Sequence, residues 1–159
     1  MKIYIASDHA GFELKEKIKN HLKENNYEVE DLGAHVLNKD DDYPDFAFVA
    51  AEKVAESKGK SKAILFCGSA EGMCIAANKV RWVRAIAAWT PTTAQLSRER
   101  NDANVLCLSG GKTLVPIPGL SLEEAERIVD AWLSTEFSAE ERHMRRLKKI
   151  EEFEALWQK

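Results

Sequence analysis

The chain has 159 residues, of which 45% are hydrophobic and 31% charged, and its formal net charge is -3 at pH 7. This length and balance are typical of one soluble globular domain, so we predict a single domain over residues 1–159. The weak net charge gives no reason to expect nucleic acid or a membrane surface as a partner, and no apolar run reaches the roughly 20 residues that span a bilayer.

Cysteine usage indicates a reducing compartment. The three cysteines, Cys67, Cys74 and Cys107, are odd in number and far apart, which does not suit a disulfide framework. The chain also begins directly with a strand-like segment rather than with the pattern of a signal peptide, and we therefore expect a cytoplasmic protein. No pair of Cys or His residues has zinc-ligand spacing, so we expect no metal site.

Strand-like and helical patterns alternate along the chain. We predict five strands, at 2–7, 27–32, 63–66, 83–89 and 104–108. Helices are predicted between and after them, at 12–22, 46–55, 73–80, 92–100 and 122–133, and a charged helix follows at about 138–157. This alternation indicates an α/β fold with a doubly wound, Rossmann-like, five-stranded parallel sheet and a C-terminal helix.

Ligands of such a sheet bind in the crevice outside the carboxyl ends of the strands. Chemistry is therefore expected in the segments that follow the first, third, fourth and fifth strands. These segments are Asp8-His9, Cys67–Gly72, Trp89–Thr93 and Ser109–Lys112.

The strongest local signal is the turn from Cys67 to Gly72, which leads from a buried strand into a helix. Backbone N–H groups at a helix N-terminus favour negative charge, so a thiol there is expected to have a lowered pKa, and the same N–H groups can stabilise an oxyanion. A buried core cysteine is the alternative interpretation. The turn lacks the Lys-Ser/Thr pair of a P-loop, and no G-x-G-x-x-G follows the first strand, so nucleotide binding has little support.

Asp8 and His9 stand where the first strand ends. An Asp in this place caps a helix more often than it catalyses, and a His beside it is commonly a turn residue. A basic cluster near the start of the last helix is formed by Arg142, Arg145 and Arg146. Such a cluster is usually a solvated helix face. The alternative is a phosphate site, because guanidinium groups bind phosphate oxygens bidentately.

Taken together, these motifs resemble one family over nearly the whole chain: the type B ribose-5-phosphate isomerases with their galactose-6-phosphate and allose-6-phosphate isomerase relatives. The motifs that carry the resemblance are Ser7-Asp8-His9-Ala10-Gly11-Phe12-Glu13-Leu14-Lys15, Asp42-Tyr43-Pro44-Asp45, Cys67-Gly68-Ser69, Ile75-Ala76-Ala77-Asn78-Lys79-Val80, Ser97-Arg98-Glu99, Asn101-Asp102-Ala103-Asn104-Val105-Leu106, Ile128-Val129-Asp130-Ala131-Trp132-Leu133, and Arg142-His143 with Arg146.

The resemblance implies an aldose–ketose isomerase of a sugar phosphate without metal or organic cofactor, in a homodimer or dimer of dimers with shared active sites. It implies that Cys67 removes the C2 proton to give an enediolate, and that Ser69 and Asp8 serve ring opening and contacts to the sugar oxygens. It also implies that His9 binds the phosphate together with two arginines of the partner subunit. The positions implied to bind substrate are His9, Tyr43, Gly68, Ala70, Glu71, Gly72, Asn101, Lys112, Arg142 and Arg146, and the C-terminal helix is expected to contribute to the dimer.

Four positions depart from the pattern of the family. Arg100 stands where many members carry a His that opens the sugar ring, and an arginine cannot make that proton transfer. Ala70 and Glu71 change the usual C-G-[ST]-G-x-G turn, and Ala70 is expected to alter the shape of the oxyanion loop because alanine lacks the freedom of glycine at positive φ. Lys112 replaces a phosphate-binding Arg.

The substrate that we predict is ribose 5-phosphate, which is converted to ribulose 5-phosphate. A four-carbon aldose or ketose phosphate is the alternative that suits the missing His, because such a sugar cannot close a furanose ring. Galactose 6-phosphate and allose 6-phosphate are further alternatives, and a non-catalytic sugar-phosphate-binding homologue is an alternative of another class.

Overall fold

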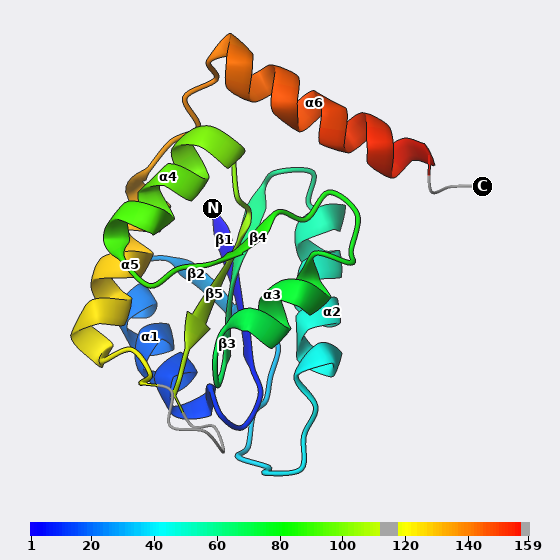
Figure 1. The fold of residues 1–159 in the computed structure, drawn as a ribbon. Coiled ribbons are helices and arrows are strands. Elements are labelled where there is room, and N and C mark those ends of the chain that lie inside the picture. Colours follow the sequence, from blue (N-terminus) through cyan, green and yellow to red (C-terminus); the bar gives the residue numbers. More distant parts are fainter. Residues whose placement is uncertain (112–117, 157–159) are drawn as a thin grey trace.

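The computed structural model describes residues 1–111 and 118–156, which form a parallel sheet between two layers of helices (Figure 1). Within these residues the sheet has five strands in the order β2-β1-β3-β5-β4. The strands are β1 Lys2–Ser7, β2 Glu28–Asp31, β3 Ser61–Cys67, β4 Ala85–Ala87 and β5 Val105–Ser109. The helices are α1 Phe12–Glu24, α2 Tyr43–Glu56, α3 Glu71–Ala77, α4 Pro91–Asn101, α5 Leu122–Ser134 and α6 Glu141–Leu156. The predicted fold class is confirmed.

Of the differences from the predicted boundaries, the end of one helix and the start of the next strand are explained by Asn78. The predicted helix at 73–80 starts at Glu71 and ends at Ala77, and the predicted strand at 83–89 is only Ala85–Ala87. The Asn78 side chain accepts a hydrogen bond from the backbone N–H of Ala85 at 2.8 Å and donates to its carbonyl at 2.9 Å. It therefore ends the helix and turns the chain at a point that the hydrophobic pattern does not mark.

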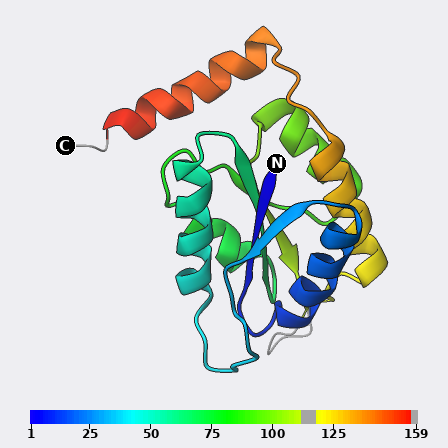
Figure 2. The ribbon, with the colours of Figure 1, turned by 180° about the vertical axis from the view of Figure 1, so that it is seen from behind.

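Two hydrophobic cores lie on the two faces of the sheet. Figures 1 and 2 show α2 and α3 against one face and α1, α4 and α5 against the other. The first core is rich in alanine, with Ala47, Ala50 and Ala51 fully buried on α2, and the second centres on Trp132, which is also fully buried. The central strands are apolar on both faces, as a sheet covered on both sides requires.

Three loops meet backbone to backbone at the carboxyl edge of the sheet. A Cβ on Gly11 would lie 2.3 Å from the carbonyl carbon of Phe66, and a Cβ on Gly110 would lie 2.3 Å from the carbonyl oxygen of Ala10. Only glycine permits these approaches. The loops after β1, β3 and β5 are thereby held against one another.

Helix α6 lies across the opposite, amino end of the strands (Figures 1 and 2). It is joined to the rest of the chain near Ser138, whose backbone N–H donates to the Glu99 carbonyl of α4 at 3.0 Å. Only His143 and Leu147 of this helix are buried, whereas Met144, Ile150 and Phe153 are among its exposed apolar side chains. None of the helices in the described ranges is long and apolar enough to cross a membrane.

A buried ion pair links α1 to the end of β2. The Lys15 side chain is fully buried, and its Nζ donates to Asp31 Oδ1 at 2.8 Å and to the Ala34 carbonyl at 2.7 Å. Lys19 binds the other oxygen of Asp31 at 2.7 Å. Burial alone raises the pKa of Asp31, but these cations outweigh it and lower the pKa from 3.8 to about 2.

We predict that Asp31→Asn lowers the free energy of unfolding at pH 7 by roughly 2 kcal/mol or more, because a pKa lowered by almost two units corresponds to about 1.36 kcal/mol per unit. A depressed pKa stabilises the native state above pH 3.8, and this stabilisation is lost as the pH falls toward 2. Urea unfolding at pH 7 and pH 3 should therefore show a flatter pH dependence in the variant. Glu28→Gln, which removes a surface ion pair, is the control and should leave the midpoint almost unchanged.

Candidate active site

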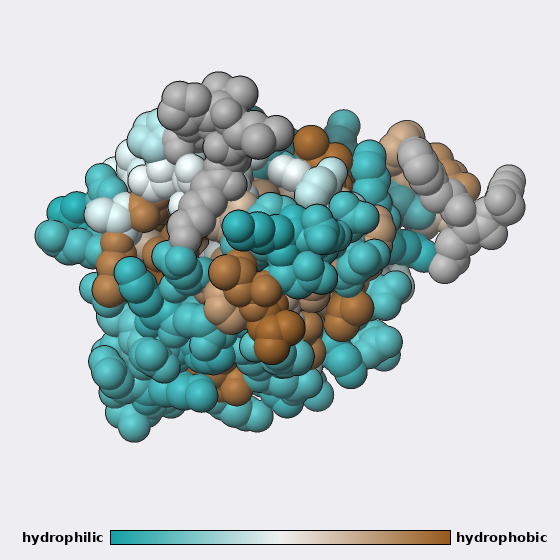
Figure 3. Space-filling view, turned by 90° about the horizontal axis from the view of Figure 1, so that it is seen from below, coloured by the Kyte–Doolittle hydropathy of each residue, from teal (hydrophilic) through white to brown (hydrophobic). Residues whose placement is uncertain are grey.

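The predicted site segments after β1, β3 and β5 do come together at the carboxyl edge. The Asp8 backbone N–H donates to the Phe66 carbonyl, and the backbone N–H of Gly110 donates to the Cys67 carbonyl at 2.8 Å. The hydroxyl of Ser109 donates to the Gly68 carbonyl at 2.6 Å. Figure 3 looks onto this edge, which is largely hydrophilic with separate hydrophobic patches.

Cys67 ends β3 and is only 3% exposed. The backbone N–H groups of Met73, Ser69 and Ala70 act on its thiol in the direction that favours the thiolate, as the prediction of an anion-binding turn requires. The predicted lowering of its pKa is wrong, however. Burial raises the pKa of the thiol, the nearby carboxylate of Asp8 acts in the same direction, and the three N–H groups only oppose this rise.

The turn keeps a left-handed residue although it has alanine at that position. Ala70 has a φ of 69° and is fully buried just before α3. The expectation that alanine changes the shape of the loop is therefore not met at this residue, which accepts the strain of the left-handed region. Ala70 thus turns the chain between Cys67 and α3, the helix whose Met73 N–H acts on the thiol.

The carboxylate of Asp8 organises the loop after β1. Its Oδ1 accepts hydrogen bonds from the backbone N–H groups of Ala10 at 2.9 Å and Gly11 at 3.0 Å. These two residues precede α1, whose N-cap is Gly11 without a side-chain cap, so the interpretation of Asp8 as a helix cap is wrong. The residue is 6% exposed, and burial raises the pKa of its carboxyl although these N–H groups oppose the rise. Asp8 therefore lies buried within the electrostatic reach of Cys67, where it can hold the loop and accept a proton at once.

His9 is paired with a carboxylate that the sequence analysis did not identify. Asp41 Oδ1 accepts hydrogen bonds from His9 Nδ1 at 2.7 Å and from the His9 backbone N–H at 2.9 Å. The hydrogen bond to Asp41 raises the pKa of His9, against a smaller opposing effect of burial. In the sequence, Asp41 is the middle of three consecutive aspartates in a polar loop, and nothing in the pattern separates it from its neighbours.

Tyr43 joins the site from the start of α2. A Cβ on Gly72 would lie 3.0 Å from the Cζ of Tyr43, so the phenol ring packs directly against this glycine. Glu71 is exposed in the first turn of α3, where a carboxylate is favoured by the helix dipole. Tyr43 thus lies against the turn to which Glu71 and Gly72 belong.

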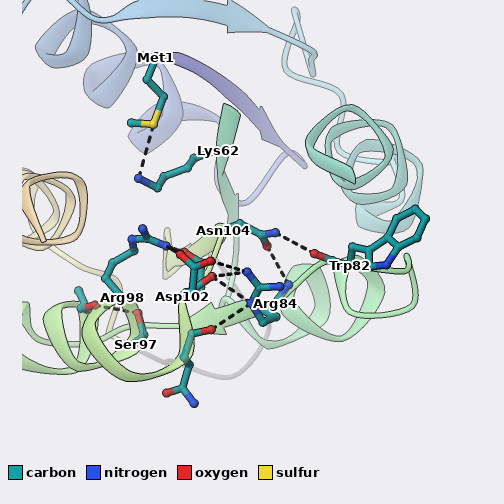
Figure 4. A network of polar contacts seen from close by, with 11 residues as sticks. Met1, Lys62, Trp82, Arg84, Ser97, Arg98, Asp102 and Asn104 are labelled. Atoms are coloured by element: carbon teal, nitrogen blue, oxygen red, sulfur yellow. Dashed lines mark hydrogen bonds and ion pairs between the residues drawn. The ribbon is translucent and has the colours of Figure 1, made fainter. Parts of the chain in front are cut away.

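Asn101 and Arg100 lie at the opposite edge of the sheet in the same chain. Helix α4 starts after β4 and runs back to the amino edge, where Arg84 Nε donates to the Asn101 carbonyl at 3.0 Å. Figure 4 shows Asp102 between Arg84 and Arg98, with ion pairs of 2.8 and 2.7 Å. Within one chain, Asn101, which the resemblance implies to bind substrate, therefore lies away from the Cys67 turn.

The predicted phosphate-binding arginines are also remote from Cys67. Arg142 and Arg146 lie on α6, at the amino edge, and both are exposed. Arg142 Nε contacts Glu140 Oε2 at 2.8 Å. Lys112, the remaining predicted contact, lies outside the residues that the structure describes.

Comparison with known proteins identifies the family. The model of the ribose/galactose isomerases matches residues 3–150. The chain belongs to this family. A probable ribose-5-phosphate isomerase B of Mycoplasma genitalium is 43% identical over 96% of this chain and 95% of its own length. Ribose-5-phosphate isomerase B of Mycobacterium tuberculosis is 41% identical over 97% of this chain and 90% of its own.

Solved structures of ribose/galactose isomerases have the same fold. The ribose-5-phosphate isomerase B of Mycoplasma genitalium with bound ribulose-5-phosphate superposes with a TM-score of 0.89 at 43% identity, covering 97% of this chain and 96% of that one. The enzyme of Clostridium thermocellum superposes with a TM-score of 0.88 at 42% identity, covering 99% of both chains. The resemblance inferred from the motifs is confirmed.

The strain at Ala70 can be tested by substitution. We predict that Ala70→Gly changes the free energy of unfolding by less than about 1 kcal/mol, because relief of about 1 kcal/mol of left-handed strain offsets the loss of a buried methyl group worth about 0.8 kcal/mol. Ala70→Val should cost about 2 kcal/mol or more, because a β-branched side chain meets both the strain and the packed core.

Urea unfolding measures both changes. Ala139 is a matched control, since it has a φ of 52° but is exposed. Ala139→Val should cost clearly less than Ala70→Val, because only the backbone strain applies there. Equal stabilities of Ala70→Gly and Ala70→Val would contradict the left-handed, buried placement of this residue.

Proposed function

We propose that this protein interconverts ribose 5-phosphate and ribulose 5-phosphate. Membership of the ribose/galactose isomerase family supports the reaction class, and the relative from Mycoplasma genitalium, whose structure holds ribulose-5-phosphate, supports the substrate. The observation that carries the proposal is the Cys67 thiol, which ends a central strand under three backbone N–H groups and beside the Asp8 carboxylate.

In the proposed reaction, the Cys67 thiolate takes the C2 proton of the open-chain aldose. The electron pair of the C2–H bond forms the C1–C2 double bond, and the carbonyl pair moves to O1 to give an enediolate. The N–H groups from Ser69 to Gly72 are placed to stabilise this oxyanion. Cys67 then returns its proton to C1, which takes the electron pair of the C1–C2 double bond. The O2 proton moves to O1 while the O2–H pair forms the C2=O2 double bond, so that the aldose becomes the ketose with no metal or organic cofactor.

A second copy of the chain completes the proposed site. Three carboxylates, those of Asp8, Asp41 and Glu71, lie along the edge that holds Cys67, so a phosphate dianion needs cations from elsewhere. Arg142 and Arg146 are exposed at the other edge of the molecule, on the helix whose apolar side chains are least buried. In a symmetric homodimer, each copy can supply these arginines and Asn101 to the other.

The pairing also bears on the chemistry of the thiol. Burial raises the pKa of Cys67, which leaves little thiolate near neutrality in a single chain. The positive charge of two arginines of the partner subunit favours the thiolate, and exclusion of water by the partner strengthens that effect. A thiol base requires reducing conditions, which supports a cytoplasmic location.

Nuclear magnetic resonance in deuterated water tests the reaction. Ribose 5-phosphate should be converted to ribulose 5-phosphate with deuterium at C1, and Cys67→Ala should lower the rate by at least about 1,000-fold because it removes the base. Ser61→Ala, at the far end of the same strand, is the control and should retain activity. If only a four-carbon aldose phosphate or a hexose 6-phosphate is converted, that sugar is the substrate in place of ribose 5-phosphate. If none of these sugars is converted, the proposal is overturned.

Mixed dimers test the shared site. We predict that Cys67→Ala and Arg142→Ala/Arg146→Ala are each inactive as homodimers and regain about one quarter of the wild-type activity when they are mixed and allowed to exchange subunits. Half of the dimers are then mixed, and each has one of its two sites intact. A mixture of Cys67→Ala with Cys67→Ser is the control and should stay inactive. No recovery in exchanged dimers would show that the arginines do not act across subunits.

A further inference from the structure

The pair formed by His9 and Asp41 is built differently from the other close histidine–carboxylate pair of the described residues. His21 Nε2 lies 2.8 Å from Asp130 Oδ1 on the surface between α1 and α5, where the Asp130 side chain is 55% exposed. Asp41, in contrast, has a side chain that is only 8% exposed. A single oxygen of it receives both the ring and the backbone N–H of His9, at 2.7 and 2.9 Å.

The other oxygen of Asp41, Oδ2, is buried and has no hydrogen-bond partner among the described residues. A buried carboxylate that is only half satisfied is costly unless a cation balances its charge. Protonated His9 supplies that charge, and the hydrogen bond to Asp41 raises the pKa of His9 accordingly. The pair is therefore suited to hold an imidazolium near neutral pH.

The position of His9 leaves one ring nitrogen for a ligand. Nδ1 is occupied by Asp41, so Nε2 is the nitrogen that can reach outward, and the side chain is 35% exposed. His9 directly follows Asp8, and the charge of Asp8 acts on both His9 and the Cys67 thiol. The imidazolium thus stands beside the groups assigned to the reaction.

Ribose 5-phosphate needs such an acid because it exists mainly as a furanose ring. The ring oxygen is attached to C4, one carbon from the C5 that carries the phosphate. A group at the phosphate end of the site is therefore also near the ring oxygen. Arg100 cannot act as this acid, because a guanidinium does not release its proton at neutral pH.

We propose that His9, held by Asp41, opens the sugar ring by donating its Nε2 proton to the ring oxygen O4 as the C1–O4 bond breaks. The electron pair of that bond goes to O4. The O1 proton passes to the Asp8 carboxylate, and its bonding pair forms the C1=O1 double bond. Solvent returns the proton from Asp8 to His9, so the step consumes no co-reactant. This inference rests on the proposed function and adds to it the group that prepares the open-chain substrate.

The test compares a cyclic substrate with an acyclic one. Ribulose 5-phosphate cannot close a furanose ring, because O5 carries the phosphate, so exchange of its C1 hydrogen with deuterated water needs Cys67 but no ring opening. His9→Asn should lower kcat for ribose 5-phosphate at least about 100-fold. At saturating ribulose 5-phosphate, where loss of a phosphate contact affects KM and not kcat, the exchange rate should fall less than about 3-fold. At high enzyme concentration, the residual forward rate should level off at the spontaneous rate of ring opening.

Asp41→Asn gives a second, independent readout. The groups that face His9 in the described residues are Asp41 and Asp8. An acid with a raised pKa is active below that pKa and loses activity as the pH rises through it. Removal of Asp41 lowers the pKa, so the alkaline decline of kcat/KM for ribose 5-phosphate should move to lower pH, with little change in the exchange reaction. His21→Asn removes the matched surface histidine and should change neither the pH dependence of kcat/KM nor the exchange reaction.

Other results of these experiments would overturn either ring opening by His9 or the proposed function itself. A parallel loss of both reactions in His9→Asn, with a raised KM, would limit His9 to binding phosphate and overturn the inference. An unchanged forward rate would overturn it as well. Absence of exchange in the unmodified protein would instead contradict the proposed isomerase function. The failure of the ring-opening inference can therefore be distinguished from the failure of the proposed function.

Discussion

The site depends on the close approach of three backbone segments at the carboxyl edge of the sheet. Gly11 packs against the backbone of Phe66, and Gly110 packs against the carbonyl oxygen of Ala10, at separations that no side chain allows. These contacts hold the loop after β1 against the ends of β3 and β5. As a result, Asp8 and His9 lie beside the end of the strand that carries Cys67, although almost 60 residues separate them in the sequence.

The same topology separates the two kinds of chemistry that a sugar phosphate needs. Proton-transfer groups gather at the carboxyl edge, where a carboxylate and a thiol are buried together. Exposed arginines gather on α6 at the amino edge, and Arg84 and Arg98 fix the turn that carries Asn101 there. A single chain therefore cannot bring the two sets together. In the proposed homodimer the two sets meet without any change of fold, and the arginines of the second copy add positive charge to a site where burial alone disfavours the thiolate.

Much of the fold and part of the site follow from the sequence. Alternating strands and helices predict the sheet, and the turn after Cys67 marks the proposed oxyanion loop, because periodicity and turn residues are local properties. The pKa of Cys67 could not be predicted, since its burial depends on helices that pack from elsewhere in the chain. The partnership of Asp41 with His9 was missed for the same reason, as three consecutive aspartates give no sign of which one is buried. The position of Asn101 could have been inferred, because a helix that follows a strand in this fold runs back toward the amino edge.

The most direct test is a crystal structure of the Cys67→Ala protein with ribulose 5-phosphate. The removal of the base should trap the sugar. The account of a shared site predicts that C1 and C2 lie against residue 67 and the N–H groups after Ala70, with the phosphate bound by Arg142 and Arg146 of the partner subunit and His9 beside it. A phosphate held without the partner's arginines, or a sugar bound away from residue 67, would contradict it.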